Sequence, residues 1–119
     1  MGPRLTPAIR HLITLQRGLI ADWQARELGM PRNTLMRARR TGWMQVSPHV
    51  FIDRDSELIV GQLRMAGVLE CGPGAVLAGR SSLAEHGWRA DDESHVEVVV
   101  PRGRRLRARG APAWLRMHH

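Results

Sequence analysis

Three glycines divide the first 42 residues of the chain into short segments, and each segment has the pattern of a helix. Gly18, Gly29 and Gly42 each follow apolar residues at helical spacing, and glycine is a residue that commonly ends helices. Thr6 and Pro7 form a start signal, because threonine caps a helix N-terminus and proline fits the first helical position. The sequence therefore predicts three short helices before residue 43.

A buried strand and a hairpin complete this pattern. Leu19 and Ile20 indicate a short extended segment, and in the following helix Trp23 and Leu28 are expected to face the core. Residues 43–46 and 50–52 have the composition of strands, and the turn residues 47–49 lie between them. Three helices and a two-stranded wing within about 52 residues predict a winged helix-turn-helix. We assign this DNA-binding domain to residues 1–54.

Residues 55–119 are expected to form a smaller mixed α/β unit of helices and a β-hairpin. Whether this unit is truncated relative to longer relatives is left open. Ser56 can cap a long helix with one apolar side, and the Cys71-Gly72-Pro73-Gly74 segment ends it. A short apolar segment follows at residues 76–77. Ser81 or Ser82 can cap a helix of about two turns. Strands are predicted at residues 95–100 and 113–117. The apolar side of the long helix contains Leu58, Ile59, Leu63, Ala66 and Leu69. The fold class that follows is α+β.

The third helix, at about residues 32–41, is the most informative segment for function. At about 100° per residue, Pro31, Leu35 and Ala38 fall on one face and suit a core. The opposite face carries side chains that form paired hydrogen bonds with guanine and adenine edges in a DNA major groove, with Met36 beside them. These residues, the predicted base contacts, are Asn33, Arg37 and Arg40.

Contacts to the DNA backbone are predicted on both sides of this helix and in the second half of the chain. Arg32 and Arg39 lie at the ends of the helix, and His49 lies at the tip of the wing. A second basic segment at residues 102–109 is either a second phosphate-binding surface or a solvated loop. We include Arg102, Arg104 and Arg105 of that segment in the predicted DNA-binding set.

The charge of the chain supports nucleic acid as a partner and argues against several enzymes. The net charge is +7, and all 18 basic residues other than histidine are arginines. A phosphate-loop NTPase, a Schiff-base enzyme and a common class of metal-dependent nuclease core each use a lysine, and the chain has none. Nine arginines oppose four acidic residues in residues 1–55, so the positive charge is concentrated where the winged helix is predicted.

The order of several motifs resembles the AbiEi-type antitoxins, which are transcriptional regulators of type IV toxin–antitoxin systems. The wing segment Trp43-Met44-Gln45-Val46-Ser47-Pro48-His49-Val50-Phe51 is similar to the family's wing, although histidine replaces its usual glycine and phenylalanine its tyrosine. Residues 72–77, 80–84 and 98–103 resemble the middle region of the family. The resemblance covers residues 9–117 and implies an autorepressor that binds its own operator. It also implies a cognate toxin protein as a second partner, through a C-terminal part that relatives have beyond this region.

No residue pattern in the sequence supports catalysis, so we predict that the chain is not an enzyme and needs no cofactor or metal. A single cysteine, Cys71, excludes a disulfide within the chain and a thiolate zinc site built from it alone. Ser81 and Ser82 lack the context of a serine nucleophile. The acidic loop at residues 91–93 and the nearby Glu97 have no metal-ligand spacing; the residues are Asp91, Asp92, Glu93 and Glu97.

Two other interpretations remain open. The winged helix can be a protein-interaction module that binds a toxin partner, or the DNA-targeting part of a truncated nuclease. A homodimer on an inverted repeat also stays open, although no coiled-coil pattern supports it. The sequence has neither a signal-peptide pattern nor an apolar run of membrane-spanning length, so we expect no membrane association and a cytoplasmic protein.

Overall fold

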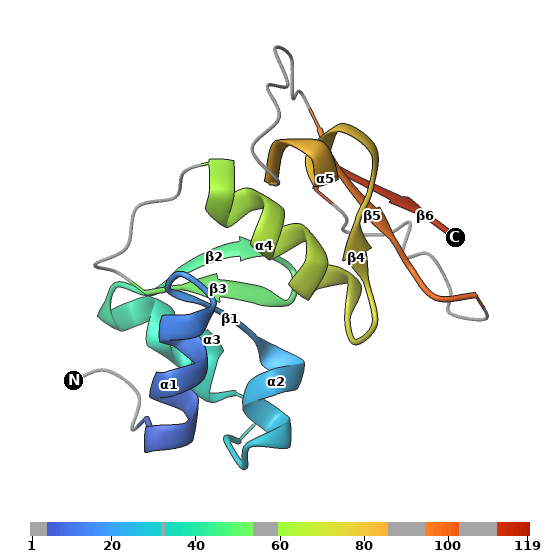
Figure 1. Cartoon of the computed structure of the whole chain (residues 1–119). Coiled ribbons are helices and arrows are strands. Elements are labelled where there is room, and N and C mark those ends of the chain that lie inside the picture. Colours follow the sequence, from blue (N-terminus) through green and yellow to red (C-terminus); the bar gives the residue numbers. More distant parts are fainter. Residues whose placement is uncertain (1–4, 32, 54–59, 86–94, 103–111) are drawn as a thin grey trace.

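The computed structural model describes residues 5–31, 33–53, 60–85, 95–102 and 112–119 (Figure 1). Helices and strands are interspersed along the chain, and the strands form two three-stranded sheets. The predicted α+β class is therefore confirmed.

The N-terminal elements occur in the predicted order. They are α1 (Pro7–Leu15), β1 (Leu19–Ala21), α2 (Asp22–Glu27), α3 (Thr34–Ala38), a 3₁₀ turn (Arg39–Thr41), β2 (Met44–Ser47) and β3 (Val50–Ile52). Thr6 caps α1 as expected, because its hydroxyl accepts the backbone N–H of Ile9 at 3.3 Å. Gly42 has a φ of +101°, which lets the chain turn from the 3₁₀ turn into β2.

Two residues expected in the core are exposed. Leu28 lies one residue beyond the end of α2 and is 40% exposed, so it does not share the buried face of that helix. Pro31 is exposed because α3 begins at Thr34, later than the sequence indicated. Leu35 and Ala38 are each 3% exposed, so the core face of α3 itself was predicted correctly.

The first sheet has the order β1-β3-β2 with antiparallel pairing, and its strands β1 and β3 are buried on both faces. Ile20 and Phe51 point to the cluster formed with α1, α2 and α3. Leu19, Val50 and Ile52 point to the other face, where α4 (Val60–Cys71) packs. This alternation follows from the two-residue repeat of a strand. The sheet thus lies between the three N-terminal helices and α4 (Figure 1).

The second sheet contains β4 (Val76–Leu77), β5 (Val96–Val99) and β6 (Leu115–His118), in that order. Both predicted strands are present, and β6 pairs parallel with β5. The helix α5 (Gly79–Glu85) begins before the predicted serine cap. Ser81 is fully buried inside it, where its hydroxyl accepts the backbone N–H of Glu97 at 2.9 Å and donates to the carbonyl of His95. The predicted capping role was therefore wrong for this serine. Its side chain instead hydrogen-bonds to the backbone at the start of β5.

The helix α4 packs on both sheets, and the prediction of a single apolar side was wrong. Ala66 and Leu69 belong to the core cluster on the first sheet, whereas Leu63 packs against the cluster on the second. Leu58 and Ile59 lie outside the described residues. A helix placed between two sheets needs apolar residues on two faces, which blurs the periodic pattern of a surface helix.

Candidate nucleic-acid interface

The exposed face of α3 gathers the residues that the sequence predicted as base contacts. Asn33, Met36, Arg37 and Arg40 line a shallow depression of about 350 Å³ on the surface. Their spacing is i, i+3, i+4 and i+7, so they form one stripe along the helix and its 3₁₀ extension. The depression presents two guanidinium groups, one amide and one thioether to the exterior.

The orientation of this stripe is fixed by the other side of the helix. Leu35 and Ala38 are buried in the cluster that includes Ile9, Phe51 and Trp43. A rotation of α3 that hid the stripe would expose Leu35, and fully exposing such a side chain costs about 1.5–3 kcal/mol. The stripe therefore faces outward because the core holds the opposite side.

The interface is positively charged. Arg37, Arg39 and Arg40 are all exposed, and none of them forms an ion pair with a described residue. Residues 28–52 contain no aspartate or glutamate. Three guanidinium groups that lack acidic partners on their own segment are suited to binding phosphate or the acceptor edges of guanine.

Of the other predicted DNA contacts, those that the structure describes do not line this depression. Arg102 is exposed and follows β5 in the second sheet. Arg32, Arg104 and Arg105 lie outside the described residues.

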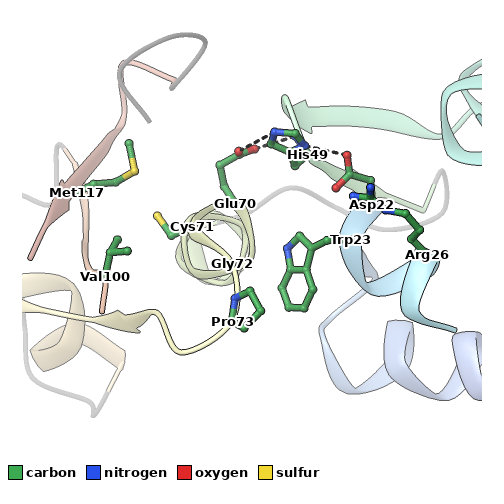
Figure 2. Close-up of a pocket in the computed structure, with 10 residues that line it drawn as sticks. All are labelled: Asp22, Trp23, Arg26, His49, Glu70, Cys71, Gly72, Pro73, Val100 and Met117. Atoms are coloured by element: carbon green, nitrogen blue, oxygen red, sulfur yellow. Dashed lines mark hydrogen bonds and ion pairs between the residues drawn. The ribbon is translucent and has the colours of Figure 1, made fainter. Parts of the chain in front are cut away.

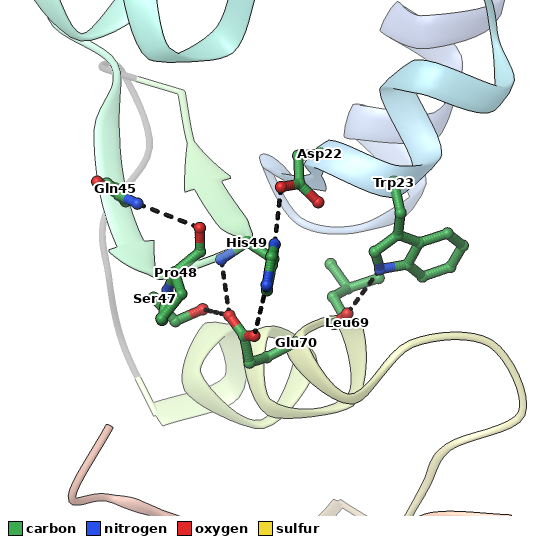
Figure 3. A network of polar contacts seen from close by, with 8 residues as sticks. All are labelled: Asp22, Trp23, Gln45, Ser47, Pro48, His49, Leu69 and Glu70. Atoms are coloured by element: carbon green, nitrogen blue, oxygen red, sulfur yellow. Dashed lines mark hydrogen bonds and ion pairs between the residues drawn. The ribbon is translucent and has the colours of Figure 1, made fainter. Parts of the chain in front are cut away.

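The turn between β2 and β3, at residues 47–49 of the predicted wing, is the wing turn. A polar cluster that the sequence did not predict connects it to α2 and α4 (Figure 3). Nδ1 of His49 lies 2.8 Å from a carboxylate oxygen of Asp22, the first residue of α2. Oε1 of Glu70, near the end of α4, accepts the Ser47 hydroxyl at 2.6 Å and the His49 backbone N–H at 2.8 Å. The cluster joins β2 and β3 to two helices at one point.

This cluster changes the role of His49. Its imidazole is one-third exposed, and Nε2 lies 4.0 Å from the second carboxylate oxygen of Glu70. A ring placed between two carboxylates is poorly suited to approach a phosphate, since both acidic groups would repel the DNA backbone. His49 holds the turn between β2 and β3 in place, and its imidazole is turned to the protein and not to the α3 depression.

A second concavity lies beside the cluster, between α2, the C-terminal end of α4 and the second sheet (Figure 2). It has a volume of about 510 Å³, with Trp23, Pro73, Val100 and Met117 on its apolar walls. The indole N–H of Trp23 donates to the carbonyl of Leu69 at 2.8 Å, so this wall also fixes α2 against α4. Among the described residues, the carboxyl oxygen Oδ1 of Asp22 is buried without a hydrogen-bond partner.

One signal for the polar cluster was present in the sequence. Glu70 is an acidic residue at the end of an apolar helix, directly after Leu69. It is 6% exposed, and a buried carboxylate needs partners. The sequence offered no means of identifying Ser47 and His49, more than twenty residues away, as those partners.

No protein-family model matches the chain, and no curated protein matches it. The AbiEi resemblance therefore stays a hypothesis based on its motifs. In the part of the chain that the structure describes, no helix combines the length and apolar character of a membrane span. The same residues contain no group of three metal-ligating side chains; Asp91, Asp92 and Glu93 lie outside them.

Proposed function

We propose that the chain binds double-stranded DNA sequence-specifically, with the exposed face of α3 in a major groove. Asn33, Arg37 and Arg40 contact base edges, and Arg39 contacts the phosphate backbone. In this proposal residues 7–52 act as a winged helix-turn-helix, with α2 and α3 as its two central helices.

The observation that carries the proposal is the arginine-lined depression on α3. Two arginines and an asparagine share one outward stripe of a helix whose other side is buried. Arginine and asparagine form bidentate hydrogen bonds with guanine and adenine, respectively. In a helix that only faces solvent, this stripe would slightly destabilise the helix, because like charges at neighbouring helical positions repel each other.

We further propose that the DNA is the operator of the protein's own gene and that binding there represses transcription in the cytoplasm. This step rests on the AbiEi resemblance of the motifs. A toxin partner follows from the same resemblance and defines the alternative hypothesis, in which the chain is a protein-interaction module.

The test is duplex binding to DNA from upstream of the gene, measured at about 50 and 200 mM salt. We expect the affinity to fall steeply with salt, since each phosphate contact releases a bound counterion. Arg37→Ala should weaken binding by about 5- to 150-fold, the value of one bidentate base contact of about 1–3 kcal/mol. Arg116→Ala is the matched control, because it removes an equal charge from an exposed position of β6, outside the α3 depression.

The two alternatives predict different results. Salt-independent or absent binding to every duplex tested would contradict the DNA proposal and leave the protein-interaction module. Equal losses for Arg37→Ala and Arg116→Ala would show that only net charge matters. Metal-dependent cleavage of DNA would revive the third hypothesis, a truncated nuclease.

A further inference from the structure

The stripe on α3 contains one apolar side chain whose exposure the fold does not require. Met36 is 47% exposed and lines the depression with Asn33, Arg37 and Arg40. It follows Asn33 by three residues and precedes Arg40 by four, so its side chain lies between theirs on the helix surface. An apolar group thus sits in the middle of a polar, cationic surface.

The core does not explain this methionine. Leu35 and Ala38 supply the buried side of α3, and Met36 belongs to none of the three core clusters. Other apolar side chains are as exposed, such as Met44 and Val76, but of these Met36 is the one that lines the α3 depression, so it would contact any surface that lies against the stripe.

The chemistry of a major groove offers one matching apolar feature. Each base edge there presents hydrogen-bond donors or acceptors, and thymine adds its C5-methyl group. Methionine has no donor and only a weak acceptor, so a polar base edge facing it would lose hydrogen bonds with water and gain none. Its flexible thioether chain adapts well to a small apolar neighbour.

We propose that Met36 contacts the C5-methyl group of a thymine and makes the affinity depend on an A·T pair at that position. The inference rests on the proposed function, since it requires α3 to lie in a major groove. Asn33, one turn earlier, is suited to an adenine, and the two arginines are suited to guanines. The bound site therefore combines an A·T pair opposite the N-terminal part of α3 with G·C pairs opposite its C-terminal part.

The experiment uses a duplex obtained by in-vitro selection from a random-sequence pool with the whole chain. Each thymine of the site is replaced in turn by deoxyuridine, which keeps every hydrogen-bonding group and lacks only the methyl. For the wild type, we expect one or two positions where this change weakens binding by about fourfold, the contribution of one buried methyl-sized group. At those positions Met36→Ala should bind the two duplexes equally.

The control is Met44→Ala. Met44 has the same exposure of 47% but lies on β2, outside the α3 depression. This variant should retain the wild-type dependence on the methyl group. Both side chains are exposed, so circular dichroism should confirm that each variant folds.

Three outcomes overturn the inference. If the wild type binds a selected site with equal affinity for every thymine and its deoxyuridine counterpart, the methyl contact does not exist. If Met36→Ala keeps the full dependence, another residue makes the contact. Both results leave DNA binding intact, whereas failure to select any bound duplex refutes the proposed function together with this inference.

Discussion

Replacing Gly67 by alanine tests a close approach of α4 to the second sheet. A Cβ atom at this position would lie 2.9 Å from Val96 Cγ1, 3.1 Å from Leu115 Cδ1 and 3.4 Å from Val98 Cγ2. Carbon atoms in good contact are about 3.5–4.0 Å apart, so the shortest distance is too small by at least about 0.6 Å. All three neighbours are buried, and the two valines have little freedom about χ1. The helix must therefore move away from the sheet.

The expected magnitude combines two opposing effects. An extra methyl group in a well-packed core costs about 1–3 kcal/mol, and contact with three side chains places Gly67→Ala in the upper half of that range. Alanine in a helix interior gains about 1 kcal/mol over glycine. We expect a net loss of about 1–2 kcal/mol in the free energy of unfolding.

Gly61→Ala provides the matched control in the same helix. Its Cβ would lie 2.7 Å from Nη1 of Arg17, the end of a flexible, exposed side chain that can shift away. Such a shift weakens the surface ion pair of Arg17 with Glu85, and the helix propensity of alanine offsets this loss. We expect this variant to be unchanged in stability to within about 0.5 kcal/mol, or slightly more stable. Urea unfolding followed by tryptophan fluorescence should place the Gly67→Ala midpoint about 1 M below that of Gly61→Ala, for an m-value of about 1.5 kcal/mol/M. Equal midpoints would refute the close packing of α4 on the second sheet.

Three further predictions concern the contacts that join the two halves. Glu70→Ala should destabilise the protein by about 2–3 kcal/mol, because it leaves two donors of the wing turn unsatisfied, whereas Glu70→Gln keeps an acceptor and should cost less; urea unfolding of both variants measures this difference. Trp23→Phe should cost about 1 kcal/mol through the lost hydrogen bond to α4, measured in the same way, and no loss would contradict that bond. Burial raises the pKa of the Glu85 carboxyl, but hydrogen bonds from Arg64 and Arg17 outweigh it and hold the pKa below its ordinary value. The ion pairs therefore add stability above the unfolded-state pKa of about 4.3, and this contribution is lost as the pH falls through the lower, folded-state value. Because Glu85 is partly exposed, the contribution is about 0.5–1 kcal/mol, and Glu85→Gln should reduce stability by that amount at pH 7 but not at pH 2–3.

Local signals in the sequence were sufficient to predict the N-terminal elements. The cap at Thr6 and the glycine after the 3₁₀ turn depend on the backbone within a few residues of each position. The outward face of α3 was also predictable, because a helix with Leu35 and Ala38 on one side must present Arg37 and Arg40 on the other.

The arrangement of the second half depends on contacts between distant residues, and the sequence could not predict it. Ser81 has the local pattern of a helix cap, but its hydroxyl bonds to the backbone of β5, fourteen and sixteen residues away. The apolar residues of α4 pack on two sheets, so no single periodic stripe describes them. Such pairings depend on tertiary packing, which overrides local preference.

The tie between the wing and α4 has a consequence for how the proposed interface works. A wing free to move would have to be ordered when DNA binds, which costs conformational entropy. Here Glu70 is 6% exposed and accepts two hydrogen bonds from the wing turn, so the turn is ordered before any partner arrives. The same contacts turn His49 toward the protein and leave α3 as the charged surface of the N-terminal half. Under the proposed function, specificity depends on the few exposed side chains of α3 and its ends. A change at Asn33, Met36, Arg37 or Arg40 should then alter DNA recognition without altering the fold.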